Sequence, residues 1–236
     1  MDLRLRLPIG TEQKMNHHAF TFAEEQLWAM ADGSLFWPAR RILVVSDLHL
    51  GKSERIARRQ GMLLPPFETA DTLERLQSKI NDLGPRTVVC LGDSFDDDTA
   101  AQSLGESDQL WITKLQAGRE WIWVAGNHDP QNVPFGGTQV REFLHGKLVM
   151  RHIAEEGAEF EISGHFHPKA RVSTRKGGLS RPCFLIDERR VIMPAFGTYT
   201  GGLRCADPAL QKVMSDRAVA VLIGPEPLPV PFASQK

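Results

Sequence analysis

ILVVSDLH, residues 42–49, joins a short apolar run to two side chains that can bind a metal ion. Residues 42–46 are rich in β-branched residues, which predicts a strand buried on both faces. Asp47 and His49 follow where this strand ends, and a carboxylate and an imidazole there can reach one ion. An Asp that caps a turn beside a surface His gives the same pattern by chance. The pair therefore needs support from the rest of the chain.

Two later apolar runs end in the same way. Residues 87–91 (TVVCL) lead through a glycine into Asp93, and residues 121–125 (WIWVA) lead through a glycine into Asn127. Apolar residues at helical spacing separate the first two runs, and a weaker helical pattern separates the second from the third. Alternating strands and helices predict a parallel sheet, which binds ligands beyond the carboxyl ends of its strands.

Short strands dominate the second half of the chain. We expect them at residues 148–152, 159–163, 183–187, 191–193 and 218–223. They indicate a second, more antiparallel sheet packed on the first. We therefore predict an α/β fold of two packed mixed sheets flanked by helices, with the site at the C-terminal ends of the strands.

The motif Gly-Asn-His-Asp, residues 126–129, is hard to explain as a turn alone. A tight turn accounts for the glycine and Asn127, but not for His128 and Asp129 at the mouth of the sheet. Asn127 offers a neutral amide oxygen as a ligand. His128 then remains free to act on a substrate.

Three histidines follow strands of the second half. His152 closes one strand, and His165 and His167 follow the next one. His165 and His167 are two residues apart, so both point the same way. A lone His at a strand end is more often structural than ligating. Three imidazoles from two strand ends favour a metal site.

Each of these motifs follows a predicted strand, and together they resemble the motifs of the calcineurin-like metallophosphoesterase superfamily. Their order along the chain is Asp-x-His, Gly-Asp, Gly-Asn-His-Asp, His and Gly-His-x-His. The resemblance implies a four-layer sandwich and a phosphoesterase with two divalent metal ions. It implies that Asp93 bridges the ions and that His128 meets the substrate phosphate or leaving group. It divides the other ligands between the two ions: Asp47, His49 and His167 for one, and Asn127, His152 and His165 for the other.

Further segments look like the ligase-associated metallophosphoesterases, a bacterial branch implicated in DNA repair. These segments are LHLGK (48–52), LPP (64–66), RPCF (181–184) and PAFGTYTGG (194–202). The resemblance implies action on DNA and a functional association with a DNA ligase and a helicase. Many members have a histidine three residues after the Gly-Asp, where this chain has Asp96. The role of position 96 therefore stays open, and Asp96 is left out of the ligand set.

Two divalent ions roughly 3.5 to 4 Å apart can activate a bridging water and hold the phosphoryl oxygens during in-line attack. The expected nucleophile is metal-bound hydroxide, which explains why no motif carries an activated Ser or Cys. His128 would neutralise charge or protonate the leaving oxygen, with Asp129 as its orienting partner. Nitrogen and oxygen ligands without thiolate favour manganese, iron or zinc. By resemblance, manganese is the first choice.

Basic residues follow both ends of the ligand set. They either bind a phosphate backbone or lie in solvated loops. The net charge of −1 does not distinguish these two interpretations. A basic segment over residues 169–181 follows the last ligands. The candidate substrate-binding residues are Lys52, Arg55, Arg59 and Arg181.

We predict a phosphodiesterase or nuclease that acts on DNA in repair. The alternative is a small-molecule phosphodiesterase that cleaves nucleotides or cyclic nucleotides, and weaker salt dependence would distinguish it. A third possibility is a non-catalytic scaffold, against which the complete ligand set argues. The preference for monoester or diester, the mode of cleavage and the oligomeric state stay open. Tyr199 and Phe196 line the cleft or pack in the core, and core packing is favoured for Phe196.

The length of 236 residues predicts one domain. We expect a flexible arm over residues 1–18, the single domain over residues 19–224 and a Pro-rich tail over residues 225–236 that is extended or disordered. No stretch is apolar enough to span a bilayer, and the cysteines form no C-x-x-C pair. A cytoplasmic protein without membrane association is the expectation. Each cysteine is expected in the core: Cys90, Cys183 and Cys205.

Overall fold

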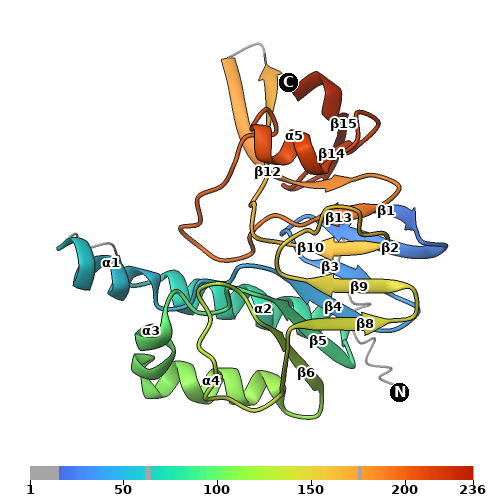
Figure 1. Ribbon diagram of the computed structural model, residues 1–236. Coiled ribbons are helices and arrows are strands. Elements are labelled where there is room, and N and C mark those ends of the chain that lie inside the picture. The colour runs from blue at the N-terminus through green and yellow to red at the C-terminus, as the bar shows by residue number, and fades with distance from the viewer. Residues whose placement is uncertain (1–15, 62–64, 175–176, 236) are drawn as a thin grey trace, which may run out of the picture.

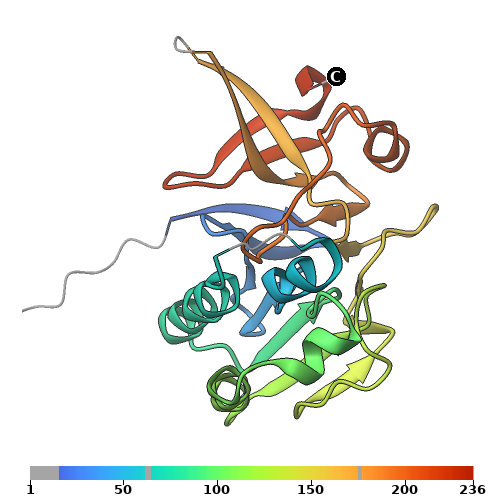
Figure 2. The ribbon, with the colours of Figure 1, turned by 90° about the vertical axis from the view of Figure 1, so that its left-hand side faces the viewer.

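The computed structural model describes residues 16–61, 65–174 and 177–235. Two β-sheets pack face to face, with helices over the outer face of the first sheet and one short helix, α5 (Pro208–Val213), beside the second (Figure 1, Figure 2). The architecture confirms the predicted α/β fold of two mixed sheets flanked by helices. Within the described ranges, no helix has the length and apolar character needed to cross a membrane.

The centre of the first sheet consists of the three strands predicted from the apolar runs. β4 (Ile42–Val45), β5 (Thr87–Leu91) and β6 (Glu120–Val124) are parallel neighbours, with Val44 beside Val89. Because parallel strands end at the same edge of a sheet, the polar residues that follow them are brought together.

Four strands outside the prediction extend this sheet. β1, β2 and β3 form an antiparallel meander that reaches β4, while β7 pairs with β6 in parallel. Their bounds are β1 (His17–Phe22), β2 (Glu25–Met30), β3 (Leu35–Trp37) and β7 (Thr138–Val140). β3 and β7 have three residues each, too few for an alternating pattern to be recognised.

The helix predicted between the first two strands is α2 (Glu68–Leu83). It buries Leu73, Leu76 and Ile80, and it ends at Gly84, whose φ of 54° is in the left-handed region that glycine adopts easily. The other helices on this side of the sheet are α1 (Lys52–Gln60), α3 (Asp98–Ser103) and α4 (Glu106–Gln116). α4 accounts for most of the weaker helical pattern.

The second sheet has the order β15-β14-β12-β13-β10-β9-β8. β9 (Leu148–Arg151) and β10 (Glu161–Ser163) are parallel, so their carboxyl ends also share an edge. The first part of β12 (Gly177–Ile186) pairs with β11 (Lys169–Thr174) in a ribbon that projects from the body of the molecule (Figure 1, Figure 2). The remaining strands are β8 (Glu142–His145), β13 (Arg190–Ile192), β14 (Val219–Leu222) and β15 (Leu228–Pro231).

The two sheets share an apolar core. It includes Val44, Val89 and Ile122 from the first sheet and Ile162 and Phe184 from the second, all at most 3% exposed. Alternate residues of β4, β5 and β6 face the helices instead and form a separate cluster with them. This packing holds the carboxyl ends of β4, β5 and β6 against those of β9 and β10.

Both ends of the domain differ from the expected boundaries. Residues 1–15 of the expected arm lie outside the described residues, but His17 and His18 belong to β1. Residues of the expected tail form β15, which pairs with β14, and the following Phe232 is fully buried. Proline is compatible with an edge strand because its missing N–H faces no partner there. Of the two expected forms the tail thus has the extended one, and it is an ordered edge of the second sheet rather than a segment outside the domain.

Replacement of Phe232 by alanine tests whether the C-terminal segment is part of the core. We expect Phe232→Ala to lower the free energy of unfolding by about 3 to 5 kcal/mol, the usual effect of removing a buried phenyl ring. Urea denaturation followed by circular dichroism measures it. Leu228→Ala, at a side chain 49% exposed, is the control and should have a much smaller effect. Equal effects of the two changes would contradict the anchoring role of Phe232.

Candidate metal centre

Asp47, His49 and His167 come together beyond the carboxyl ends of β4 and β10. One potential ligand atom from each lies within 4.8 Å of the other two. His167 Nε2 is 2.9 Å from Asp47 Oδ1, and the ring centroids of His49 and His167 are 5.5 Å apart. The structure thus places side by side the three residues that the family resemblance assigns to one ion.

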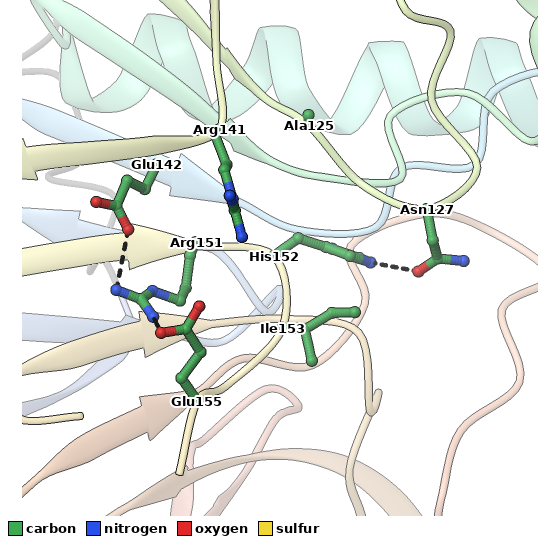
Figure 3. A pocket seen from close by; sticks show the side chains of 8 residues that line it. All are labelled: Ala125, Asn127, Arg141, Glu142, Arg151, His152, Ile153 and Glu155. Atoms are coloured by element: carbon green, nitrogen blue, oxygen red, sulfur yellow. Dashed lines mark hydrogen bonds and ion pairs between the residues drawn. The ribbon is translucent and has the colours of Figure 1, made fainter. Parts of the chain in front are cut away.

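A second group consists of Asp93, His152 and His165, whose ligand atoms satisfy the same 4.8 Å limit. His152 Nε2 lies 3.3 Å from Asp93 Oδ2 and 3.2 Å from His165 Nδ1. Asn127 joins this group, because its Oδ1 is 3.0 Å from His152 Nε2 (Figure 3). Asp93 thus lies in the second candidate group, and its bridging of both ions stays a prediction.

The two groups share one edge of the molecule. The backbone N–H of His165 donates to Asp47 Oδ2 at 3.0 Å, which joins a residue of the second group to a residue of the first. His152 Nδ1 is 3.9 Å from Asp47 Oδ1. Side chains from five strand ends, those of β4, β5, β6, β9 and β10, therefore surround one small region.

The backbone at this edge has an unusual conformation. A positive φ is rare outside glycine, and where it occurs the surrounding structure must hold it in place. Here it occurs at five of the predicted ligands: Asp47 (53°), His49 (46°), Asp93 (48°), His165 (67°) and His167 (46°). Strained backbone of this kind concentrates at functional sites. This concentration is independent of the side-chain chemistry and points to the same residues.

Two glycines allow the close approach of these loops. Gly92 has a φ of 80°, and a Cβ there would overlap the ring of His152. A Cβ at Gly164 would overlap Ser46, so the loop after β10 could not reach the end of β4. Both glycines are needed to bring the second sheet against the first.

The buried imidazole nitrogens show whether the residues fit a metal ion. Nε2 of His49 and Nε2 of His167 are buried and have no hydrogen-bond partner among the described residues. The approach of His167 to Asp47 has no hydrogen-bond geometry. A buried polar atom without a partner costs free energy, and coordination to a cation removes that cost. The donor set of imidazole, carboxylate and amide oxygen therefore fits two divalent ions.

The pKa shifts of Asp93, Asp47 and His165 favour their ligating forms, whereas that of His152 has the opposite direction. Burial opposes ionisation of Asp93, but the hydrogen bond and charge of His152 outweigh it and lower the pKa of Asp93 to about 2. Burial likewise opposes ionisation of Asp47, and the nearby His167 outweighs it, so its pKa is lowered. Burial and the neighbouring His152 lower the pKa of His165, which favours the neutral imidazole that binds metals. Burial lowers the pKa of His152, but its contacts with the two carboxylates raise it overall.

Asp96, whose role the sequence left open, holds one of the ligands. It is fully buried, and its Oδ1 lies 2.8 Å from His49 Nδ1. A hydrogen bond at Nδ1 fixes the proton there and leaves Nε2 free for a metal ion. Burial opposes ionisation of Asp96, but His49 and Arg55 outweigh it and lower its pKa to about 2. Asp96 thus orients His49 and is not itself in either ligand group.

The basic residues that follow the first ligand pair in the sequence, and that were predicted to bind substrate, form ion pairs with carboxylates of this chain. Lys52 and Arg55 both form ion pairs with Asp96. Arg59 and its neighbour Arg58 pair with Asp97. These ion pairs hold α1 against the loop after β5 and argue against the predicted substrate binding by Lys52, Arg55 and Arg59. Arg181 is half-buried beside Gly224 and belongs to neither ligand group.

His128 and Asp129 have different positions. His128 is exposed, its ring centroid lies 5.6 Å from that of His49, and its N–H donates to Asp93 Oδ1 at 2.9 Å. The Asp129 carboxylate accepts hydrogen bonds from the N–H groups of Phe95 and Gly126, at 3.0 and 2.9 Å. Burial raises the pKa of Asp129. Asp129 thus shapes the loop, and no hydrogen bond joins it to the His128 ring among the described residues, which corrects its predicted orienting role.

A cavity of about 320 Å³ opens beside the second ligand group (Figure 3). Asn127 and His152 line it together with Arg141 and Arg151. Arg151 pairs with Glu142 and with Glu155. Arg141 is exposed and points towards His152, and in the described part of the chain no carboxylate forms an ion pair with it. No sequence pattern pointed to Arg141, because a lone arginine between two short strands belongs to no recognisable motif.

Phe196 and Tyr199 differ in burial, and Phe196 has the core position that the sequence predicted. Phe196 is 1% exposed and packs in the core, with the Arg75 guanidinium 4.6 Å from its ring centroid. Tyr199 is exposed, in the loop between β13 and α5 that hydrogen-bonds to the backbone of Ser46 and Asp47 after β4. A role for Tyr199 in the substrate cleft stays a prediction.

Comparison with known proteins gives two kinds of match. The family model described as calcineurin-like phosphoesterase matches residues 40–220. The solved structure of Pseudomonas putida nuclease MPE is similar, with a TM-score of 0.70 and 26% identity over 91% of this chain and 100% of that chain. Yfce, a phosphoesterase from E. coli, is matched at a TM-score of 0.38 and 13% identity over 83% of this chain and 94% of that chain, too weakly to support an argument. No curated protein matches.

Replacement of Asp96 tests whether it orients His49. We expect Asp96→Ala to weaken manganese binding by about 10- to 100-fold, the usual effect of removing the partner of a ligating imidazole. Isothermal titration of the metal-free protein measures the affinity, and circular dichroism checks the fold. Asp98→Ala removes the same charge from an exposed position two residues away and should bind manganese normally. Equal affinities of the two variants would contradict the role of Asp96.

Proposed function

This chain belongs to the calcineurin-like phosphoesterase family, and from that premise we propose that it is a nuclease that hydrolyses phosphodiester bonds in DNA with two divalent metal ions. The family and the similar nuclease structure make it a metal-dependent phosphoesterase. The bond cleaved and the polymer acted on are the parts that we propose.

One observation carries the proposal. Two groups of ligand side chains lie at one edge, and five of their residues have left-handed backbone. A fold that keeps strained backbone at that many chelating residues uses it for function. Two such groups side by side match the requirement for a pair of ions that act on one phosphate.

The residues of this chain divide the work among them. Two divalent ions, when bound, supply an activated water and neutralise charge on the phosphoryl oxygens. Asp96 orients His49, and the N–H of His128 orients Asp93. The exposed His128 ring, beside His49, is placed to donate a proton to the leaving oxygen. Arg141 lines the cavity next to the second group, where it can bind a neighbouring phosphate.

The substrate assignment rests on similarity. The protein whose structure matches over 91% of this chain is described as a nuclease, and at 26% identity the likeness extends beyond the fold. Together with the segments that resemble the ligase-associated branch, this supports DNA as the substrate and DNA repair as the setting. A ligase and a helicase are the functional partners that the same resemblance favours. Manganese is the proposed metal, since the donor set contains nitrogen and oxygen without thiolate.

Replacement of Asp93 tests the chemistry. We expect the manganese-loaded wild type to cleave a DNA oligonucleotide and bis(p-nitrophenyl) phosphate faster than p-nitrophenyl phosphate or a cyclic nucleotide. Asp93→Asn keeps the shape of the side chain but removes its charge, and should lower the rate on both diesters by at least about 100-fold. Steady-state rates on the four substrates measure this.

Asp98→Asn is the matched control and should retain wild-type rates, because Asp98 is exposed and outside both ligand groups. A wild-type preference for the monoester would overturn the phosphodiesterase proposal. Full activity of Asp93→Asn would overturn the assignment of the site.

Replacement of His128 tests proton donation to the leaving group. We expect His128→Ala to lower kcat on the DNA oligonucleotide by about 10²- to 10⁴-fold, because an alkoxide leaves poorly without a proton. The loss should be much smaller on bis(p-nitrophenyl) phosphate, since p-nitrophenolate leaves readily without protonation. Equal losses on both substrates would show that His128 does not act as the acid.

A further inference from the structure

The ribbon β11–β12 has two different faces. In its antiparallel register Lys169 is opposite Pro182 and Arg171 is opposite Ser180, so these residues share one face. Ala170, between the two basic residues, points the other way into the core, where it is fully buried. The ribbon therefore packs with one face and presents two cations on the other.

These cations line a second cavity, which we call the ribbon groove. It has a volume of about 480 Å³, and Lys169, Arg171 and Arg204 supply its charged side chains. The segments lie side by side, since Lys169 and Arg204 form a parallel bridge and Cys205 N donates to Lys169 O at 3.0 Å. The polar neutral residues of the lining are Ser180 and Gln235.

The C-terminal turn closes one side of the ribbon groove. Gln235 Oε1 accepts a hydrogen bond from Arg171 N at 2.7 Å. Phe232, in the same 3₁₀ turn, is fully buried, which fixes the position of this segment. The groove is thus built from the ribbon, the loop before α5 and the C-terminal turn.

The charges of the ribbon groove are not neutralised. Across the described ranges, no carboxylate forms an ion pair with Lys169, Arg171 or Arg204, and no acidic side chain lines the groove. The cations of α1 are the opposite case, since Asp96 and Asp97 pair with them. Cations held together without a carboxylate repel one another, and a bound anion removes that repulsion.

The ribbon groove begins next to the metal centre. Lys169 is two residues after the ligand His167, a distance of about 7 Å along an extended chain. Gly202 lies against both: a Cβ there would be 3.0 Å from His167 Cβ and 3.1 Å from Lys169 Cε. An anionic polymer held at the ligand groups can therefore continue into the groove.

We propose that the ribbon groove binds the phosphate backbone of the polynucleotide on one side of the bond that is cleaved, through Lys169, Arg171 and Arg204. This inference rests on the proposed nuclease function and deepens it. Phosphate contacts through lysine and arginine fix the register of a nucleic acid without reading its sequence. Their loss weakens binding at all sequences and reduces its salt dependence.

The test measures binding of a fluorescein-labelled DNA oligonucleotide by anisotropy, in the Asp93→Asn background so that the probe is not cleaved. Arg171→Gln with Arg204→Gln is expected to weaken binding by at least about fivefold and to reduce the slope of log Kd against log salt by about 1.4 to 1.8. Both arginines are exposed, and thermal melting checks that the fold is unchanged.

Arg58→Gln with Arg59→Gln is the matched control: it removes the same charge, but from side chains that both form ion pairs with Asp97. It should change affinity and slope little. If both pairs of substitutions weaken binding equally, or if the groove pair has no effect while the wild type still cleaves DNA, the ribbon groove inference is overturned alone. If the wild type cleaves no DNA, the proposed function falls, and this inference with it.

Discussion

The backbone conformation of the ligand loops is the constraint on which the rest of the structure depends. Asp47, His49, Asp93, His165 and His167 all have φ between 46° and 67°. Each such residue costs on the order of 1 kcal/mol or more. Hydrogen bonds between loops hold the conformation, from Asp47 N to Gly92 O, from His49 N to Asp93 O and from His165 N to the Asp47 carboxylate. The last of these bonds joins the second sheet to the first, and it forms only where the two sheets pack closely, so core packing and chelation depend on each other.

The distribution of paired and unpaired charges then divides the surface around the centre. Asp96 and Asp97 form ion pairs with the cations of α1, and Asp96 also holds His49 of the first ligand group. Arg141 on one side and the ribbon groove on the other keep cations without carboxylate partners among the described residues. A phosphate chain is attracted most strongly to cations that have no carboxylate partner. The frequency of basic residues in the sequence does not show which cations these are.

The sequence predicted the parts of the protein that follow from local pattern. β4, β5 and β6 are apolar runs, and a parallel sheet necessarily collects Asp47, Asp93 and Asn127 at one edge. The parts that it missed depend on partners distant in the chain. Arg55 looked available because Asp96, 41 residues later, could not be known to neutralise it. Asp129 looked like a partner of its neighbour His128, but its carboxylate accepts from Phe95, 34 residues earlier. The proline-rich tail looked detached because proline is read as a strand breaker, yet an edge strand tolerates it.

Anomalous diffraction from a crystal soaked in manganese is the most direct test of the two-ion site. We expect two anomalous peaks roughly 3.5 to 4 Å apart. One should be bound by Asp47, His49 and His167, and the other by the second group: Asp93, Asn127, His152 and His165. His49 should bind through Nε2 while Nδ1 keeps its hydrogen bond to Asp96. An empty edge, or manganese bound elsewhere with these histidines turned away, would contradict the account.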